Sequence, residues 1–331
     1  MLDDSSPTAL TRALASGNSE GMRPSLLAPL IVVTLAVLGT ASVPQQPTFR
    51  AGVDVVKVDV SVSRGGEHIG GLKAENFAMF DNGVQQKITG MALDEVPLEA
   101  YLVLDLSGSV QGAKLEQLKQ AASAFVDGLV PRDKVALLTF AQQVTVRQPL
   151  TADFQAFRRA LAEVTSGGQT ALYDAVSKAI SLREPRDNRA VVVVCTDDHD
   201  NASTATSKQV VDAAERSDVL VYGVMAAEDG AGRSPGAGIG FRSPQLQFQI
   251  GFLRSLADAT GGRVFRANVH LPLDEVFAMV LDDARSRYLL TYSPDKSAPG
   301  WHKLNVKLVG VKGDVVARRG YFVDKGAERA R

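Results

Sequence analysis

The chain has 331 residues, of which 45% are hydrophobic and 22% charged, and its 36 basic and 37 acidic side chains give a formal net charge of −1. The apolar fraction excludes wholesale disorder, and the near-neutral charge argues against a dedicated nucleic-acid-binding protein, which normally carries a basic excess. The single cysteine, Cys195, excludes an internal disulfide and a cysteine-based zinc site, and its apolar surroundings predict a small buried residue. The length predicts about two domains.

Residues 1–43 are predicted to form a leader. Leu26–Leu38 is an uncharged apolar run that follows Arg23 and precedes Gly39 and Ala41, the arrangement of a secretory signal peptide with a small-residue cleavage site. Extended by a few residues, the run reaches the length that spans a bilayer, so an uncleaved membrane anchor is the alternative. Because the residues before Met22 are polar, we expect the natural chain to begin there. The protein is therefore predicted to be exported, to the periplasm, the cell envelope or the outside.

Two flanking segments, 48–97 and 287–323, have the pattern of short strands. Val53–Val62 alternates apolar and polar residues, and strand character returns over Tyr288–Val323. Neither segment is long enough for a comfortable core of its own. We therefore expect them to pair as one small β module that frames the middle of the chain, with 324–331 as a tail.

The middle of the chain, 98–286, alternates strands with amphipathic helices. The expected strands are Tyr101–Asp105, Lys134–Ala141, Gln143–Gln148, Ala190–Thr196, Val219–Met225 and Arg263–Ala267. Apolar stripes at helical spacing start near Leu115, Phe154, Leu172 and Leu273, and Gly261-Gly262 is a natural end for the helix that reaches Thr260.

This alternation predicts a Rossmann-like α/β fold with a doubly wound, mostly parallel sheet of six strands. Val191–Val194 is an unbroken β-branched run, as expected for a parallel strand that is covered on both faces. The two strands on either side of Ala141-Gln142 are joined too tightly for a parallel crossover, so one is expected to be an antiparallel edge strand. With strand order 3-2-1-4-5-6, strands one and four are neighbours where the order reverses, and ligands bind at that point.

Oxygen-bearing side chains follow those two neighbouring strands. Strand one ends at Asp105 and is followed by Ser107 and Ser109, and strand four leads into Asp197. Thr170 precedes the helix that feeds strand four, so we expect it at the same edge of the sheet. Two carboxylates and three hydroxyls, with no thiolate, suit a hard divalent cation, Mg²⁺ or Mn²⁺ first and Ca²⁺ next.

At these residues the chain resembles the von Willebrand factor A-type domain, whose metal-ion-dependent adhesion site reads Asp-x-Ser-x-Ser, then a distant Thr and a distant Asp. The resemblance covers about 98–286. The flanks, with Asn76-Phe77 and Phe80–Gly83 before and Tyr288–Pro294 and Arg319–Phe322 after, resemble a bacterial family of exported proteins related to that domain. One departure is Asp198, where the family usually has Gly; its carboxylate would crowd the cation or add negative charge beside it.

The resemblance implies a function as well as a fold. Serine and threonine hydroxyls bind the cation directly, the aspartates bind it directly or through water, and one coordination position stays open for a carboxylate of a partner protein. We therefore predict divalent-cation-dependent protein binding, in adhesion or assembly, and no enzymatic turnover.

Each site residue also has an ordinary explanation. Ser109 and Thr170 could be helix N-caps, and Asp105 and Asp197 could be solvated residues at strand ends. His199 among acidic neighbours suggests a zinc ligand, although a lone histidine is more often a surface residue.

The segment 227–247 is rich in Gly, Pro and Ser and follows strand five on the side of the site. We interpret it as a flexible rim loop, with a ligand-contacting loop as the alternative.

Two other functions remain as alternatives. The sequence has no G-x-x-x-x-G-K-[ST] loop and no G-x-G-x-x-G after strand one. The residues around Ser107 do not form a G-x-S-x-G elbow and no histidine is convincingly placed, so of the enzymes only a metal-assisted hydrolase survives. The other alternative is a scaffold or assembly protein whose metal site is not essential.

Overall fold

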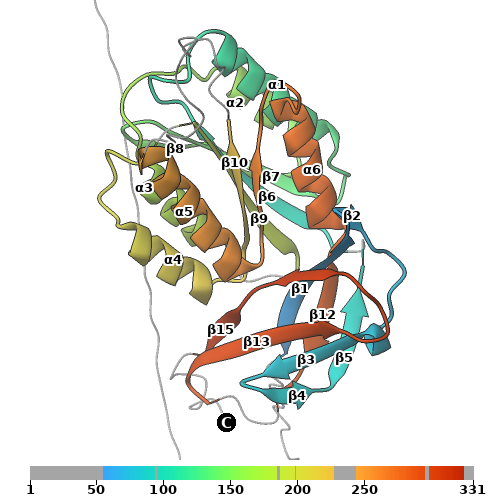
Figure 1. Ribbon diagram of the computed structural model, residues 1–331. Coiled ribbons are helices and arrows are strands. Elements are labelled where there is room, and N and C mark those ends of the chain that lie inside the picture. The colour runs from blue at the N-terminus through green and yellow to red at the C-terminus, as the bar shows by residue number, and fades with distance from the viewer. Residues whose placement is uncertain are drawn as a thin grey trace, which may run out of the picture. The chain divides into compact units, whose positions relative to one another are not determined.

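The computed structural model describes residues 55–93, 96–184, 187–197, 199–226, 244–294 and 298–323, with side chains described from residue 251 onward in the fifth of these ranges (Figure 1). The predicted leader, Asp198, most of the segment 227–247 and the tail lie outside the described residues. No helix among the described residues is both long and apolar enough to cross a membrane.

A six-stranded sheet forms the centre of the middle segment. Its strand order is β11-β10-β9-β6-β7-β8, which in chain order is the predicted 3-2-1-4-5-6. The strands are β6 (Leu98–Asp105), β7 (Lys134–Phe140), β8 (Val144–Thr151), β9 (Arg189–Thr196), β10 (Leu220–Met225) and β11 (Val264–Arg266). All neighbours are parallel except β7 and β8. The predicted mostly parallel sheet with one antiparallel edge strand is therefore confirmed.

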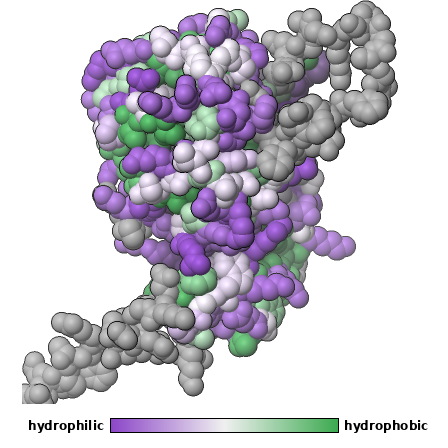
Figure 2. All heavy atoms as spheres, turned by 90° about the vertical axis from the view of Figure 1, so that its left-hand side faces the viewer, coloured by the Kyte–Doolittle hydropathy of each residue, from purple (hydrophilic) through white to green (hydrophobic). Residues whose placement is uncertain are grey.

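Helices cover both faces of this sheet, which is why its central strands are apolar throughout. The helices are α1 (Ala113–Asp127), α2 (Phe154–Ala162), α3 (Leu172–Ser181), α4 (Ser207–Arg216), α5 (Pro244–Thr260) and α6 (Leu273–Arg285). Along β6, Leu102 and Leu104 pack into the core with α1, α2 and α6, whereas Tyr101 and Val103 pack into the core with α3, α4 and α5 (Figure 1). The outer face of the layer formed by α3, α4 and α5 is largely hydrophilic (Figure 2).

The sequence analysis did not identify α4. Its start carries a capping box, in which Thr206 accepts from the backbone N–H of Gln209 and the Gln209 side chain accepts from the backbone N–H of Thr206. This Thr-x-x-Gln pattern was a readable signal for a helix start.

The two flanks form the remaining sheets. One has the order β14-β1-β12-β5 with β2 added to β1, and the other has the order β15-β13-β3-β4. Their strands are β1 (Val56–Arg64), β2 (Glu67–His68), β3 (Phe77–Asp81), β4 (Val84–Gln86), β5 (Ile88–Ala92), β12 (Tyr288–Tyr292), β13 (Gly300–Leu308), β14 (Asp314–Ala317) and β15 (Gly320–Val323). Because β1 pairs with β12 and β3 with β13, strands from both ends of the chain share each sheet, as predicted for the framing β module.

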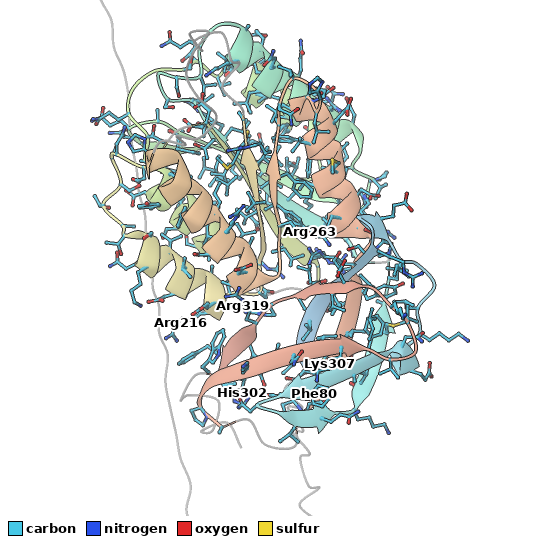
Figure 3. All side chains as sticks on the ribbon, viewed as in Figure 1. Phe80, Arg216, Arg263, His302, Lys307 and Arg319 are labelled. Carbon is cyan, nitrogen blue, oxygen red and sulfur yellow. The ribbon has the colours of Figure 1, made fainter. Side chains whose placement is uncertain are left out.

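A separate core fills this β module. The predicted alternation of β1 places Val58, Val60 and Val62 inside, where they are fully buried. Beside them, the buried Asp81 carboxylate accepts hydrogen bonds from the hydroxyls of Tyr292 and Tyr321, each at 2.9 Å, and contacts the His302 ring. The β module also contains a cation–π contact, in which the Lys307 ammonium lies 5.2 Å from the centre of the Phe80 ring (Figure 3).

Polar contacts join the β module to the central sheet. The Arg189 guanidinium at the start of β9 pairs with Asp59 of β1 at 2.6 Å. The Arg216 guanidinium of α4 lies 3.7 Å from the centre of the Phe322 ring of β15. These described contacts lie within one compact unit, Arg50–Arg331.

Gly262, just after α5, is a position where only glycine fits. A Cβ there would lie 1.9 Å from the backbone oxygen of Val221 in β10. We expect Gly262→Ala to lower the free energy of unfolding by about 2 kcal/mol. The backbone at residue 262 and the backbone of Val221 in β10 cannot move apart without disturbing the sheet. Gly251 in α5 is the control, since no atom lies within 4 Å of the Cβ it would gain. Urea unfolding of both variants tests this, and equal effects at the two positions would contradict it.

Candidate metal-binding site

Asp105, the last residue of β6, lies at the centre of the candidate site. It is 1% exposed. One carboxylate oxygen accepts the backbone N–H of Ser107 at 2.8 Å, and the other accepts the hydroxyl of Thr196 at 2.6 Å. Thr196 ends the neighbouring strand β9, so parallel pairing of β6 with β9 brings the two strand ends together.

A chain of hydrogen bonds links the remaining residues of the Asp-x-Ser-x-Ser segment to Asp197. The hydroxyl oxygens of Ser107 and Ser109 lie 3.0 Å apart, and the Ser109 hydroxyl donates to Asp197 at 2.6 Å. Residues that are 88 positions apart in the sequence are thus in direct contact at the carboxyl edge of the sheet.

Thr170 reaches the same edge through backbone contacts between two loops. The N–H of Gly108 donates to the carbonyl of Gly168 at 2.9 Å, and the N–H of Gly167 donates to the carbonyl of Leu106 at 2.7 Å. Gly168 has φ +97°, which favours glycine at this turn. Thr170 is 1% exposed, and its hydroxyl oxygen has no hydrogen-bond partner among the described residues.

The ordinary explanations for these residues are wrong. The N-cap of α1 is Gly112 and that of α3 is Ala171, so neither Ser109 nor Thr170 caps a helix. The Asp197 side chain is 2% exposed, and Asp105 is also buried, so these carboxylates are not solvated strand ends. The two carboxylates are therefore removed from water, and the hydroxyls of Ser109 and Thr170 have no capping role.

The electrostatics of the site favour an added positive charge. Burial raises the pKa of Asp105 to about 6, the nearby Asp197 adds to this, and hydrogen bonds from Ser107 and Thr196 oppose it. Buried charges in proteins are usually paired or coordinate metals, so these two carboxylates favour a cation close to them.

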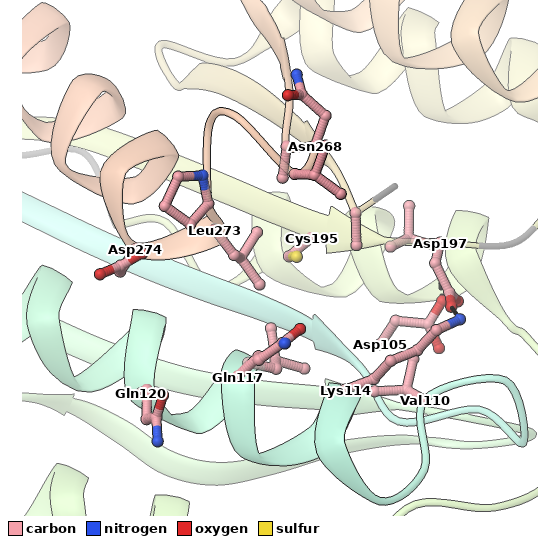
Figure 4. Close-up of a pocket in the computed structure, with 16 residues that line it drawn as sticks. Asp105, Val110, Lys114, Gln117, Gln120, Cys195, Asp197, Asn268, Leu273 and Asp274 are labelled. Atoms are coloured by element: carbon pink, nitrogen blue, oxygen red, sulfur yellow. Dashed lines mark hydrogen bonds and ion pairs between the residues drawn. The ribbon is translucent and has the colours of Figure 1, made fainter. Parts of the chain in front are cut away.

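Lys114 is a site residue that the sequence analysis missed. Its ammonium, from the first turn of α1, lies 2.9 Å from the second carboxylate oxygen of Asp197 (Figure 4). The available signal was its position on the helix that follows the Asp-x-Ser-x-Ser segment, but many lysines begin helices without contacting a site.

The donor set fits a hard divalent cation. It contains only carboxylate and hydroxyl oxygens, and the unpartnered hydroxyl of Thr170 supplies a ligand atom that nothing else in the described structure uses. No group of three or more His, Cys, Asp or Glu residues is placed to hold a metal within the described part of the chain, which gives no support to a zinc site at His199.

Comparison with known proteins agrees with this geometry. The family model for the von Willebrand factor type A domain matches residues 100–199. Inter-alpha-trypsin inhibitor heavy chain H4 of Homo sapiens is 27% identical over 166 residues, which cover 46% of this chain and 17% of that protein. The chain thus spans well under two thirds of this relative.

Solved structures with a similar fold include a von Willebrand factor type A protein from Catenulispora acidiphila, with TM-score 0.47, 15% identity, and coverage of 80% of this chain and 77% of that chain. Another is proximal thread matrix protein 1 from the mussel byssus with a zinc-occupied MIDAS motif, with TM-score 0.47, 18% identity, and coverage of 62% and 50%. The matched segment contains all five predicted ligands and Thr196, and the fold around it is the one described above. Residues 100–199 of this chain therefore match the von Willebrand factor type A domain family.

Proposed function

We propose that this chain is a protein-binding module that requires a divalent cation. Asp105, Ser107, Ser109, Thr170 and Asp197 would hold the cation. The observation that carries the proposal is the buried hydroxyl of Thr170, which has no hydrogen-bond partner among the described residues, at the same sheet edge as two buried carboxylates. The surrounding segment matches a family of protein-interaction modules.

The cation, Mg²⁺ in the first place and Mn²⁺ or Ca²⁺ as alternatives, would supply a positive centre for a carboxylate of the partner. The two aspartates formally balance the charge of the cation, and the nearby Lys114 ammonium leaves one positive charge in excess. A partner Asp or Glu is the side chain that compensates that excess best.

Turnover is not part of this proposal. The competing functions are a metal-assisted hydrolase and a scaffold that does not need its metal. Phosphate- or ester-hydrolysing turnover with Mg²⁺ that is lost in Asp105→Ala would favour the hydrolase.

We also propose the domain organisation and location that the sequence predicts. Residues 98–286 form the A-type domain, 48–97 and 287–323 are the flanks that pair with each other, and 324–331 form a tail. Residues 1–43 direct export and are either cleaved or kept as a tether. N-terminal sequencing of the native protein tests cleavage and the start at Met22.

Replacing the Thr170 hydroxyl by a methyl group separates cation binding from folding. In chelator we expect Thr170→Val to leave the free energy of unfolding unchanged or to raise it by up to about 1 kcal/mol, because the variant removes a buried hydroxyl without a partner. With excess Mg²⁺ the variant gains less stability than the unsubstituted chain. Urea unfolding in both buffers measures this, and a loss above about 1 kcal/mol in chelator would mean that the hydroxyl has a structural role.

Partner capture tests the proposed function directly. We expect the immobilised protein to retain partners from an envelope extract of its source organism in Mg²⁺ and to release them in chelator. Ser107→Ala should lose them in both buffers. Ser255→Ala, on α5 and bonded only to the carbonyl of Gly251 among the contacts described, is the matched control. Recovery of the same partners with and without chelator would favour the alternative function, a scaffold protein that does not need its metal.

A further inference from the structure

A pocket of about 410 Å³ opens beside the proposed cation site. Asp105 and Asp197 line one end of it, and it extends between α1 and the start of α6 (Figure 4). Pockets that bind ligands in proteins start at about 300 Å³, so this one is large enough for one or more side chains of a partner.

The larger part of the pocket wall is apolar, although Gln117, Gln120, Asn268 and Asp274 also line it. Val110 and Leu118 come from the α1 side, Cys195 from the end of β9, and Ala267 and Leu273 from the approach to α6. Cys195 is 2% exposed, and burial raises the pKa of its thiol, so it contributes an apolar surface to the pocket. An apolar ligand group would exclude water from this surface.

The end of the pocket at the cation site carries the complementary charge. Counted over the described residues at this end, a bound divalent cation together with the Lys114 ammonium exceeds the charge of the Asp105 and Asp197 carboxylates by one unit. A single carboxylate on the ligand balances that excess. The pocket and the site together therefore match a ligand with one carboxylate and an adjoining apolar group.

We infer that this pocket, here called the α1–α6 pocket, binds a bulky apolar side chain of the partner, next to the acidic residue whose carboxylate contacts the cation. The inference rests on the proposed function and adds its specificity: the recognised segment is Asp or Glu with Leu, Ile, Met or Phe within two positions. A Leu-sized side chain that is buried there strengthens binding by about tenfold or more.

Peptide selection tests this inference. The protein is used to select from a displayed library of random heptapeptides in Mg²⁺, with elution by chelator. We expect the eluted peptides to combine an acidic residue with a bulky apolar one. A synthetic copy of a selected peptide in which the apolar residue is replaced by Ser should bind about tenfold more weakly.

Two variants that fill the pocket provide the complementary test. Ala267→Leu and Ala226→Leu each add an isopropyl group to the side chain of a lining residue that is not a proposed ligand. Ala162→Leu on the exposed end of α2 is the matched control. In a filled variant that keeps its circular dichroism spectrum and its Mg²⁺ affinity, the acidic preference should remain and the apolar preference should disappear.

The outcomes separate the two proposals. Chelator-eluted peptides that are acidic without an apolar preference, or an apolar preference that survives filling of the pocket, overturn the inference and leave the proposed function intact. Peptides that are selected equally well in chelator overturn the proposed function.

Discussion

Replacing Arg287 by methionine is expected to lower the free energy of unfolding by about 3–5 kcal/mol. Arg287 follows α6 and is fully buried. Its guanidinium donates to Asp283 at 2.6 Å, to the hydroxyl of Tyr222 at 2.8 Å and to the carbonyl of Gly261 at 2.6 Å. It therefore ties the last helix to the central sheet and to the end of α5.

Methionine has a similar volume but leaves each of these acceptors with one partner fewer. Asp283 is the most costly of them. Burial raises the pKa of its carboxyl, but the Arg287 charge and the other contacts of Asp283 outweigh this and hold the pKa below the usual 3.8. Without Arg287, the carboxylate is a buried charge with weaker compensation.

The lowered pKa of Asp283 determines how the effect of Arg287→Met on stability depends on pH. Because the pKa of Asp283 is depressed in the folded state, its contribution to stability is present above the ordinary pKa and is lost as the pH falls through the folded pKa. The difference in the free energy of unfolding between Arg287→Met and the unsubstituted chain should be largest above about pH 5 and should become smaller in stronger acid. Urea unfolding across pH measures it.

A double substitution is the control for the Arg287 prediction. If the cost arises from the uncompensated carboxylate, Asp283→Leu combined with Arg287→Met loses less stability than the two single variants added together. A loss below about 1 kcal/mol for Arg287→Met alone would show that the network contributes little.

Asp105→Asn is expected to reduce the affinity for Mg²⁺ by at least about 100-fold and, in chelator at pH 7, to raise the free energy of unfolding by about 2 kcal/mol. The loss of affinity follows from removing one of two carboxylates in the proposed site. The gain in stability follows from removing a charge that burial disfavours, as the raised pKa of about 6 shows. Asparagine still accepts the N–H of Ser107.

The sign of the pH effect distinguishes this site from an ordinary ion pair. Because the pKa of Asp105 is raised from 3.8 to about 6 in the folded state, the contribution of this group to the stability of the cation-free protein falls as the pH rises between these values and is constant above them. The gain in the free energy of unfolding that Asp105→Asn produces in chelator should therefore be near zero at pH 4 and reach its full value above about pH 6.5. Calorimetric titration with Mg²⁺ and urea unfolding in chelator measure the two effects.

Asp212→Asn is the matched control, because this carboxylate pairs only with Lys208 on the surface of α4 among the contacts described. It should change stability by less than about 0.5 kcal/mol and leave Mg²⁺ affinity unchanged. If Asp105→Asn instead destabilised the protein in chelator at pH 7, the carboxylate would be a structural element of the fold.

Much of this architecture could be predicted because it depends on local pattern and on general rules of chain connection. The apolar run Val191–Val194 identifies a strand that is covered on both faces, and the short link at Ala141-Gln142 requires an antiparallel neighbour. With the strand order known, the meeting of Asp105 and Asp197 follows, because parallel neighbours end at the same edge.

Other features depend on contacts that no local pattern encodes. The sequence around Lys114 is an ordinary helix start, and only the packing of α1 against the sheet brings its ammonium to Asp197. The contact of Asp81 with Tyr292 joins residues 211 positions apart, across two sheets of the β module. Such contacts depend on the packing of whole elements and on the side-chain conformations that the packing allows.

The sequence by itself determined the order and type of the main elements other than α4, and it indicated the pairing of the flanks and the residues that could bind a cation. Periodicity and residue chemistry are properties of the chain, which is why these features could be predicted. Only the tertiary structure decided that the carboxylates are buried, that the Thr170 hydroxyl has no partner among the described residues and that an apolar pocket adjoins them. Burial and unmet hydrogen bonding depend on every neighbour of a group at once. These neighbours come from segments that are distant in the sequence and meet only when the sheet and its two helix layers are assembled.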